Sequence, residues 1–207
     1  QHKLGIIYYE GKYVTQDINK SIHYLSLAAN QNHSVAQYNL SIIYYEGKYA
    51  TQDINKTIHY LSLAANQNLS EAQHKLGIIY YEGKYVTQDI NKAIYYFTFS
   101  ANSNYIESLL YLGYIYYEGK YVTRDINKAI LYFSQLANQN LDDAQFFLGK
   151  IYYDGEYIAR DINKAIYYFS LAAKLNCIAA QYKLGWIYYE GKYIKRDINK
   201  SVYYFKL

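Results

Sequence analysis

Histidines are the residues of this sequence whose side chains could hold a metal ion. A zinc site needs three or four converging Cys, His or carboxylate ligands. His23 and His59 lie one repeat apart, but no cysteine or carboxylate shares their helical face at a fixed spacing. We therefore expect solvated surface histidines and no metal site. The five histidines of the chain are His2, His23, His33, His59 and His74.

The motifs of nucleophilic and phosphate chemistry are also missing from the sequence. Cys177 has no histidine near it in sequence that would activate its thiol. No Ser-x-x-Lys motif occurs, and the recurring Gly-Lys-Tyr segment lacks the further glycines of a phosphate-binding loop. The sequence thus predicts neither an enzyme nor a bound cofactor.

The most regular feature of the chain is a segment, residues 80–92 in one copy, that recurs six times at a spacing of 36 residues. A fixed period in this range indicates a repeat protein whose units stack on their neighbours. The segment contains a glycine and an aspartate, found at Gly11, Gly47, Gly83, Gly119, Gly155 and Gly191 and at Asp17, Asp53, Asp89, Asp125, Asp161 and Asp197.

The glycine and the aspartate predict where the two helices of each repeat end and begin. Gly83 follows a helical pattern and suits the left-handed residue that ends a helix. Asp89 precedes a second pattern and can cap its free N–H groups. In the third repeat we expect a first helix over residues 71–82, with Ser70 as its N-cap. The second helix should cover residues 90–102.

Each repeat is therefore predicted to be an αα-hairpin. We expect one all-helical (all-α) solenoid domain over residues 1–207, with Asn104 and its equivalents closing the second helices. The chain contains no methionine and begins within a helical pattern, so we expect a fragment of a longer protein. The expected repeats are 1–36, 37–72, 73–108, 109–144, 145–180 and the partial 181–207.

The repeat resembles the Sel-1-like repeat family, a relative of the tetratricopeptide repeats. The residues that carry the resemblance are Ala72, Leu76-Gly77, Tyr80, Gly83, Val86, Asp89, Lys92-Ala93, Tyr96, Ala101 and Asn104. Tyr85, Tyr96 and Asn104 depart from the glycine, tryptophan and glycine of the family pattern. The resemblance implies an α/α solenoid that forms a right-handed superhelix, and a role in scaffolding protein complexes.

Aromatic residues gather on the face of the first helix that lies opposite its core positions. At about 100° per residue, positions equivalent to 74, 78 and 81 share this face, and the resemblance implies that it lines the concave side. A strip this apolar predicts a partner surface. The expected partner-binding residues are Tyr38, Tyr45, His74, Ile78, Tyr81, Leu110, Tyr111, Tyr114, Tyr117, Phe146, Phe147, Lys150, Tyr153, Tyr182, Trp186 and Tyr189.

Two interpretations of these rings stay open. They could pack on one another from repeat to repeat as a tyrosine ladder. They could instead form a groove, and we then expect a scaffold that holds a peptide segment or a partner helix of another protein. The alternative is a stacking surface for carbohydrate or single-stranded nucleic acid.

Charge and hydropathy narrow the class of partner. The net charge is +4, and a row of acidic residues accompanies the lysines near the aromatic face, so we expect no nucleic acid. No apolar run approaches the ~18 residues of a membrane span, so we expect no membrane insertion. The oligomeric state stays open. The acidic row is Glu10, Glu46, Glu82, Glu118, Asp154 and Glu190.

Overall fold

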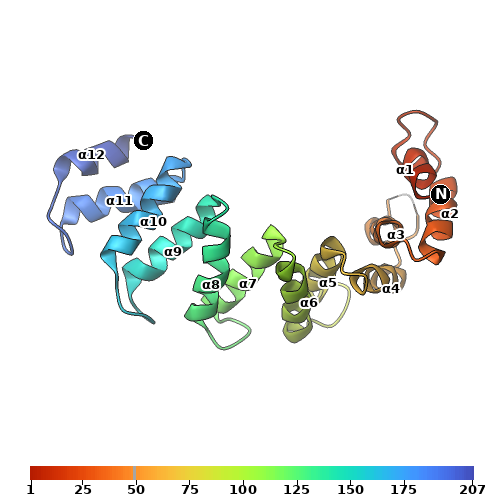
Figure 1. Ribbon diagram of the computed structural model, residues 1–207, viewed down its shortest axis with the longest axis horizontal. Helices are drawn as coiled ribbons and strands as arrows, with labels where there is room; N and C mark the ends of the chain where they lie inside the picture. Colours follow the sequence, from red (N-terminus) through yellow and green to blue (C-terminus); the bar gives the residue numbers. More distant parts are fainter. Residues whose placement is uncertain (49) are drawn as a thin grey trace. The chain divides into compact units, whose positions relative to one another are not determined.

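The computed structural model describes residues 1–48 and 50–207, and none of these residues lies in a strand. The described part of the chain forms twelve helices in two compact units, residues 1–108 and 109–207 (Figure 1). The prediction of an all-helical fold is confirmed. The helices are α1 (His2–Glu10), α2 (Ile18–Asn30), α3 (Ser34–Glu46), α4 (Ile54–Ala65), α5 (Ser70–Glu82), α6 (Ile90–Asn102), α7 (Ile106–Glu118), α8 (Ile126–Ala137), α9 (Asp142–Asp154), α10 (Ile162–Lys174), α11 (Ile178–Glu190) and α12 (Ile198–Lys206).

Successive helices pair as hairpins, and the hairpins of each unit pack on their sequence neighbours. In the first unit α1 pairs with α2, α3 with α4 and α5 with α6, while α2 contacts α3 and α4 contacts α5. In the second unit α9 pairs with α10 and α11 with α12, while α8 contacts α9 and α10 contacts α11. These contacts bury apolar positions of each hairpin, as in other repeat proteins.

The helix ends follow the local sequence closely. Asp89 is the N-cap of α6, and its Oδ1 accepts a hydrogen bond of 3.0 Å from the Lys92 amide. Gly83 ends α5 with a φ of 65°, and Asn104 has a φ of 57°. These three predictions are confirmed. The equivalent aspartates at 17, 53, 125, 161 and 197 cap their helices in the same way.

The prediction that Ser70 caps the first helix of the third repeat is wrong. Helix α5 already begins at Ser70, and Leu69 is its N-cap, without a side-chain cap hydrogen bond. The cause is the tight turn before the helix. Asn68 has a φ of 61°, and the Leu69 amide bonds back to the Ala64 carbonyl at 3.2 Å, which turns the chain into α5 one residue early.

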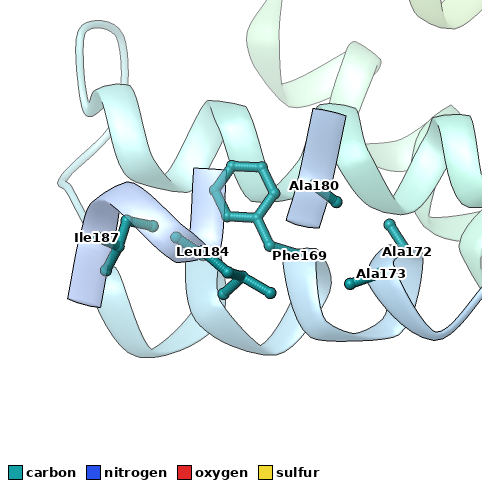
Figure 2. Close-up of a cluster of buried hydrophobic side chains, with 7 residues drawn as sticks. Phe169, Ala172, Ala173, Ala180, Leu184 and Ile187 are labelled. Carbon is teal, nitrogen blue, oxygen red and sulfur yellow. The ribbon is translucent and has the colours of Figure 1, made fainter. Parts of the chain in front are cut away.

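The core of each repeat is built from small and branched side chains around one large residue of the second helix. In the fifth repeat Phe169 of α10 lies among Ala180 and Leu184 of α11 (Figure 2), and all three are fully buried. Gly149 of α9 makes room for the ring, because a Cβ there would lie 2.6 Å from Phe169 Cδ1. Glycine is therefore needed in the middle of α9 despite its low helix propensity.

A stacked tyrosine pair joins the two helices of each hairpin. In the third repeat Tyr80 and Tyr96 have ring centroids 5.9 Å apart and an interplanar angle of 6°, and the Lys92 Nζ lies 5.0 Å from the centroid of Tyr80. Stacking and the cation–π contact stabilise the hairpin beyond its apolar core. The other pairs are Tyr8–Tyr24, Tyr44–Tyr60, Tyr116–Tyr132, Tyr152–Tyr168 and Tyr188–Tyr204.

Candidate peptide-binding surface

The first unit contains a cavity of about 530 Å³ between its first helices. Tyr38 and Tyr45 of the expected partner-binding set line it, together with Ile6 and Ile42 from equivalent positions of α1 and α3. The 36-residue spacing of the repeat explains this arrangement, because equivalent residues of neighbouring hairpins come side by side. The cavity can therefore accept an apolar side chain.

Charged and polar groups surround the apolar part of this cavity. Glu10, Glu46 and Lys75 line it, and the Tyr9 hydroxyl donates a hydrogen bond of 3.4 Å to Glu46 Oε2. Burial raises the pKa of Tyr45, with Glu82 adding to the effect, so this phenol stays neutral. An apolar floor with a few polar groups at its edge is typical of ligand-binding clefts.

The aromatic face continues along the first unit to α5. Ile78 and Tyr45 line a smaller cavity of about 20 Å³, and Tyr45 packs edge-on against Tyr85, with centroids 5.8 Å apart. Tyr81 is half-buried, and its ring centroid lies 6.4 Å from that of Phe97. These residues are thus partly packed and partly open to solvent.

The predicted exposure of His74 is wrong. Only 8% of this residue is exposed, its Nδ1 lies 2.9 Å from the Ser108 Oγ, and its ring packs beside Phe97 and Tyr105. The chain has serine at position 108 where most repeats have alanine, so the polar partner replaces a methyl group at this contact. Burial lowers the pKa of His74 to about 4, with Glu107 opposing and Lys75 adding to the shift.

In the second unit several of the expected partner-binding residues pack against one another. Tyr114 of α7 has its ring centroid 5.5 Å from that of Phe133 and 5.0 Å from that of Phe147, and Phe147 stacks on Phe133 at 5.4 Å. Tyr117 joins the same group, 5.3 Å from Phe147. Burial raises the pKa of Tyr114 to about 12. These four rings form an aromatic cluster that contributes to packing between hairpins.

Lys150 lies at the edge of this aromatic cluster. Its Nζ donates a hydrogen bond of 2.7 Å to the Tyr117 hydroxyl, and this bond raises the pKa of the Lys150 ammonium. Phe146 contacts Phe147 and Phe169, while Tyr153 contacts Phe169 and is covered in part by Tyr193. The remaining expected residues of α7, Leu110 and Tyr111, are half-buried.

The last helix pair leaves the largest rings open. Tyr182, Trp186 and Tyr189 are 55%, 39% and 46% exposed. Trp186 packs edge-on against the other two rings and against Phe205, with centroids 5.5 to 6.1 Å apart. A large ring that its neighbours hold in place binds with little loss of side-chain entropy.

The structure thus divides the expected residues among three settings. It brings some together in the cavity of the first unit, packs others in the cluster of the second unit, and exposes those of α11. Asn39 of the cavity and the loop rings Tyr85 and Tyr193 were not among the expected partner-binding residues. A signal for the loop rings was present, since tyrosine recurs at this position of the sequence in all six repeats and replaces a glycine of the family pattern.

Within residues 1–48 and 50–207, no three His, Cys, Asp or Glu side chains lie close enough together to hold a metal ion. His23 and His59 are exposed and pack beside the next tyrosine of their own helices. None of the helices described here is long and apolar enough to cross a membrane.

The sequence matches the Sel1 repeat family in six consecutive segments that together cover the chain, residues 1–33, 34–69, 70–105, 106–141, 142–177 and 178–207. The chain belongs to the Sel1 repeat family. Sel1 repeat proteins generally mediate protein–protein interactions, and this scaffold is generally non-catalytic. No match is found among curated proteins.

Two solved structures are similar over 99% of this chain. One is c5321, a protective antigen of uropathogenic Escherichia coli with an SLR fold, at 27% identity and a TM-score of 0.87. This chain spans only 44% of the length of that antigen. The other is a Sel1 repeat protein from Oxalobacter formigenes, at 32% identity and a TM-score of 0.72, of which 84% is covered.

Proposed function

We propose that this Sel1 repeat chain is a scaffold that binds a peptide segment or helix of another protein through the aromatic face of its first helices. The observation that carries the proposal is the cavity of about 530 Å³ in the first unit, lined by Tyr38, Tyr45 and Ile42. Its size and apolar lining suit one or two large apolar side chains of a peptide.

The groups at the edge of the cavity favour a protein ligand over a nucleic acid. Glu10 and Glu46 lie at the opening beside Lys75. Two carboxylates would repel a phosphate backbone, whereas they would attract a lysine or arginine next to the apolar anchor of a peptide. We therefore expect the preferred peptides to combine an apolar or aromatic residue with a basic neighbour.

The rings of α11 supply a second place where a partner would bind. Trp186 is held by Tyr182 and Tyr189 and stays 39% exposed. Tryptophan and tyrosine are the residues that most often carry binding energy at protein interfaces. The aromatic cluster around Phe133 has the different task of packing one hairpin on the next.

Peptides selected from a random display library on the full chain test this proposal. We expect Ile42→Lys, which places a charge in the apolar cavity, to weaken binding of the selected peptides by about 2 kcal/mol or more. Trp186→Ala should weaken the binding of those peptides that contact α11 by a similar amount. Affinities are measured by fluorescence anisotropy, after the melting temperatures of the variants are shown to be close to that of the parent chain.

Tyr167→Ala is the matched control, because Tyr167 is a large aromatic residue that is 58% exposed on a second helix, α10. It should leave the affinity unchanged. Equal loss in all three variants, or no loss in Ile42→Lys and Trp186→Ala, would contradict the proposal. Binding of oligosaccharides in place of peptides, abolished by Trp186→Ala, would favour the carbohydrate alternative.

A further inference from the structure

Gln67 lies in the loop after α4, and its side-chain amide nitrogen is surrounded by three hydrogen-bond acceptors. Its Nε2 lies 3.1 Å from Asn32 Oδ1, 2.7 Å from Gln37 Oε1 and 3.3 Å from the Leu63 carbonyl. Gln37 is 1% exposed, so its carboxamide oxygen depends on this donor. A buried acceptor without a donor is costly, and Gln67 removes that cost.

One repeat later the same acceptors are present, but the donor is missing. Asn68, Gln73 and Phe99 occupy the positions of Asn32, Gln37 and Leu63, while Ser103 stands where Gln67 would be. The serine hydroxyl oxygen takes the place of the glutamine Cγ, so the serine side chain is shorter by the length of the carboxamide. In the described part of the chain Gln73 Oε1 has no hydrogen-bond partner, although Gln73 is only 4% exposed.

The orientation of the Gln73 side chain is fixed by its other end. Its Nε2 donates a hydrogen bond of 3.1 Å to the Ala65 carbonyl, which leaves Oε1 as the free atom. Phe99 belongs to the last turn of α6, where helix carbonyls lack an intrahelical donor. Its carbonyl is therefore available in the same way as that of Leu63.

A cavity of about 80 Å³ lies at this place in the first unit. Asn68, Gln73 and Phe99 line it, and the rings of Tyr95 and Tyr96 form part of its wall. With about 30 Å³ for a water molecule in the liquid, the cavity has room for a carboxamide group and an adjoining methylene. Gln73 Oε1 is itself buried, so the Gln73 side chain must turn toward the cavity when an amide binds. No carboxylate is among the lining residues.

The second unit shows the same relation between the loop residue and the buried glutamine oxygen. Gln145 occupies the position of Gln37 and Gln73, and its Nε2 donates to the Ala137 carbonyl at 3.3 Å. Its Oε1 has no partner in the described part of the chain, and Leu175 stands where Gln67 would be. The acceptor is thus unpartnered in two repeats where the loop lacks the glutamine, and partnered where the loop has it.

We propose that the cavity beside Gln73 binds a primary carboxamide, the side chain of an asparagine or glutamine on a protein partner. Gln67 shows the geometry within this molecule, because its carboxamide occupies the equivalent place one repeat earlier. An ammonium group would also donate to these acceptors, but its charge would be buried without a counter-charge. The residues that line this cavity do not belong to the expected partner-binding set, so this proposal does not depend on the aromatic face binding a peptide.

Nuclear magnetic resonance with a small amide tests the site on the full chain. Propionamide is titrated into ¹⁵N-labelled protein while the side-chain NH₂ signals of Gln73 and Asn68 are followed. We expect saturable shifts of both signals. N,N-dimethylpropionamide, which has no N–H donor, should bind about tenfold more weakly or not at all.

Two substitutions exchange the residue at this loop position between neighbouring repeats. Ser103→Gln should supply the donor from the chain itself, abolish the propionamide shifts at Gln73 and raise the melting temperature. Gln67→Ser should open a second site, with new propionamide shifts at Gln37. Because one variant closes a site and the other opens one, misfolding of either leaves the other as a test.

Three results would overturn the proposal. Shifts that do not saturate would mean that the cavity holds water only. Shifts at Gln73 that persist in Ser103→Gln would place the amide elsewhere. Saturation by propylammonium at lower concentration than by propionamide would assign the cavity to an ammonium group instead.

Discussion

The His74 imidazole binds a proton more weakly than a histidine in water, because residues of α6 and of the start of α7 cover it. Burial lowers its pKa from 6.5 to about 4. The contact with Ser108 Oγ is available to the neutral ring, whose Nδ1 can donate or accept. Protonation would place a charge among Phe97 and Tyr105, where little water can solvate it.

The lowered pKa of His74 predicts a loss of stability in mild acid. Above pH 6.5 the ring is neutral in both the folded and the unfolded chain. Between pH 6.5 and about 4 the unfolded chain binds a proton that the folded chain does not, so the free energy of unfolding decreases as the pH decreases. We expect protonation at this residue to lower the free energy of unfolding by roughly 1–3 kcal/mol across this pH range, as measured by urea denaturation.

His74→Leu is the control for this pH dependence, because leucine occupies the equivalent position at Leu110. In this variant the free energy of unfolding should change less with pH over the same range, while the contributions of the other histidines remain. A side-chain titration by nuclear magnetic resonance that gave a pKa near 6.5 for His74 would contradict the prediction.

At the scale of the helices, the close approach of α9 and α10 depends on Gly149. A Cβ at this position would lie 2.6 Å from Phe169 Cδ1 and 2.8 Å from Cε1, and Phe169 is fully buried. We expect Gly149→Ala to lower the free energy of unfolding by about 1–3 kcal/mol, because the ring has no space to move. Thermal and chemical denaturation measure the loss.

The chain itself supplies the rescue variant for Gly149→Ala. In the second repeat a serine, Ser41, stands at the glycine position, and leucine, Leu61, stands at the position of the ring. Gly149→Ala combined with Phe169→Leu should therefore regain part of the lost stability. If the double variant were less stable than the single one, a clash with the ring would not be the cause.

Features set by neighbouring residues could be predicted from the sequence, and those set by other hairpins could not. The cap at Asp89 and the left-handed Gly83 depend on a few adjacent residues, so their patterns were sufficient. His74 was misplaced because periodicity describes one helix alone, whereas Ser108 of α7, in the next hairpin, covers this face. The unpartnered oxygen of Gln73 depends on Ser103, 30 positions away.

The candidate surface was predictable only as a set of positions. The sequence placed Tyr38, Tyr114 and Trp186 on the same face of their helices, but it left open whether the rings pack or stay free. The structure gives a different answer at each place, because Phe133 and Phe147 surround Tyr114 while Trp186 is 39% exposed. Such differences come from the neighbouring side chains and not from the repeat pattern.

At the scale of the whole molecule, stability is distributed along the chain. Within each unit the hairpins contact their sequence neighbours, and each repeat has its own group of buried residues. In the second repeat Leu61 is 1% exposed and packs with Ala64 of its own helix and with Ala72, Leu76 and Ile79 of α5. The stability of such an array is approximately a sum over repeats and over the contacts between neighbours.

This local packing predicts that a core defect spreads only to adjoining repeats. Leu61→Ala should lower the stability of its own repeat by about 2–5 kcal/mol. Amide hydrogen exchange, followed by mass spectrometry, should become faster in α3, α4 and α5, which share the contacts of Leu61 or adjoin them. Exchange in α11 and α12 should stay as in the parent chain, because the core beside them is built from a separate set of residues that includes Phe169 and Leu184. Equal acceleration in every helix would show that the chain opens as one cooperative body, and would contradict the additive description.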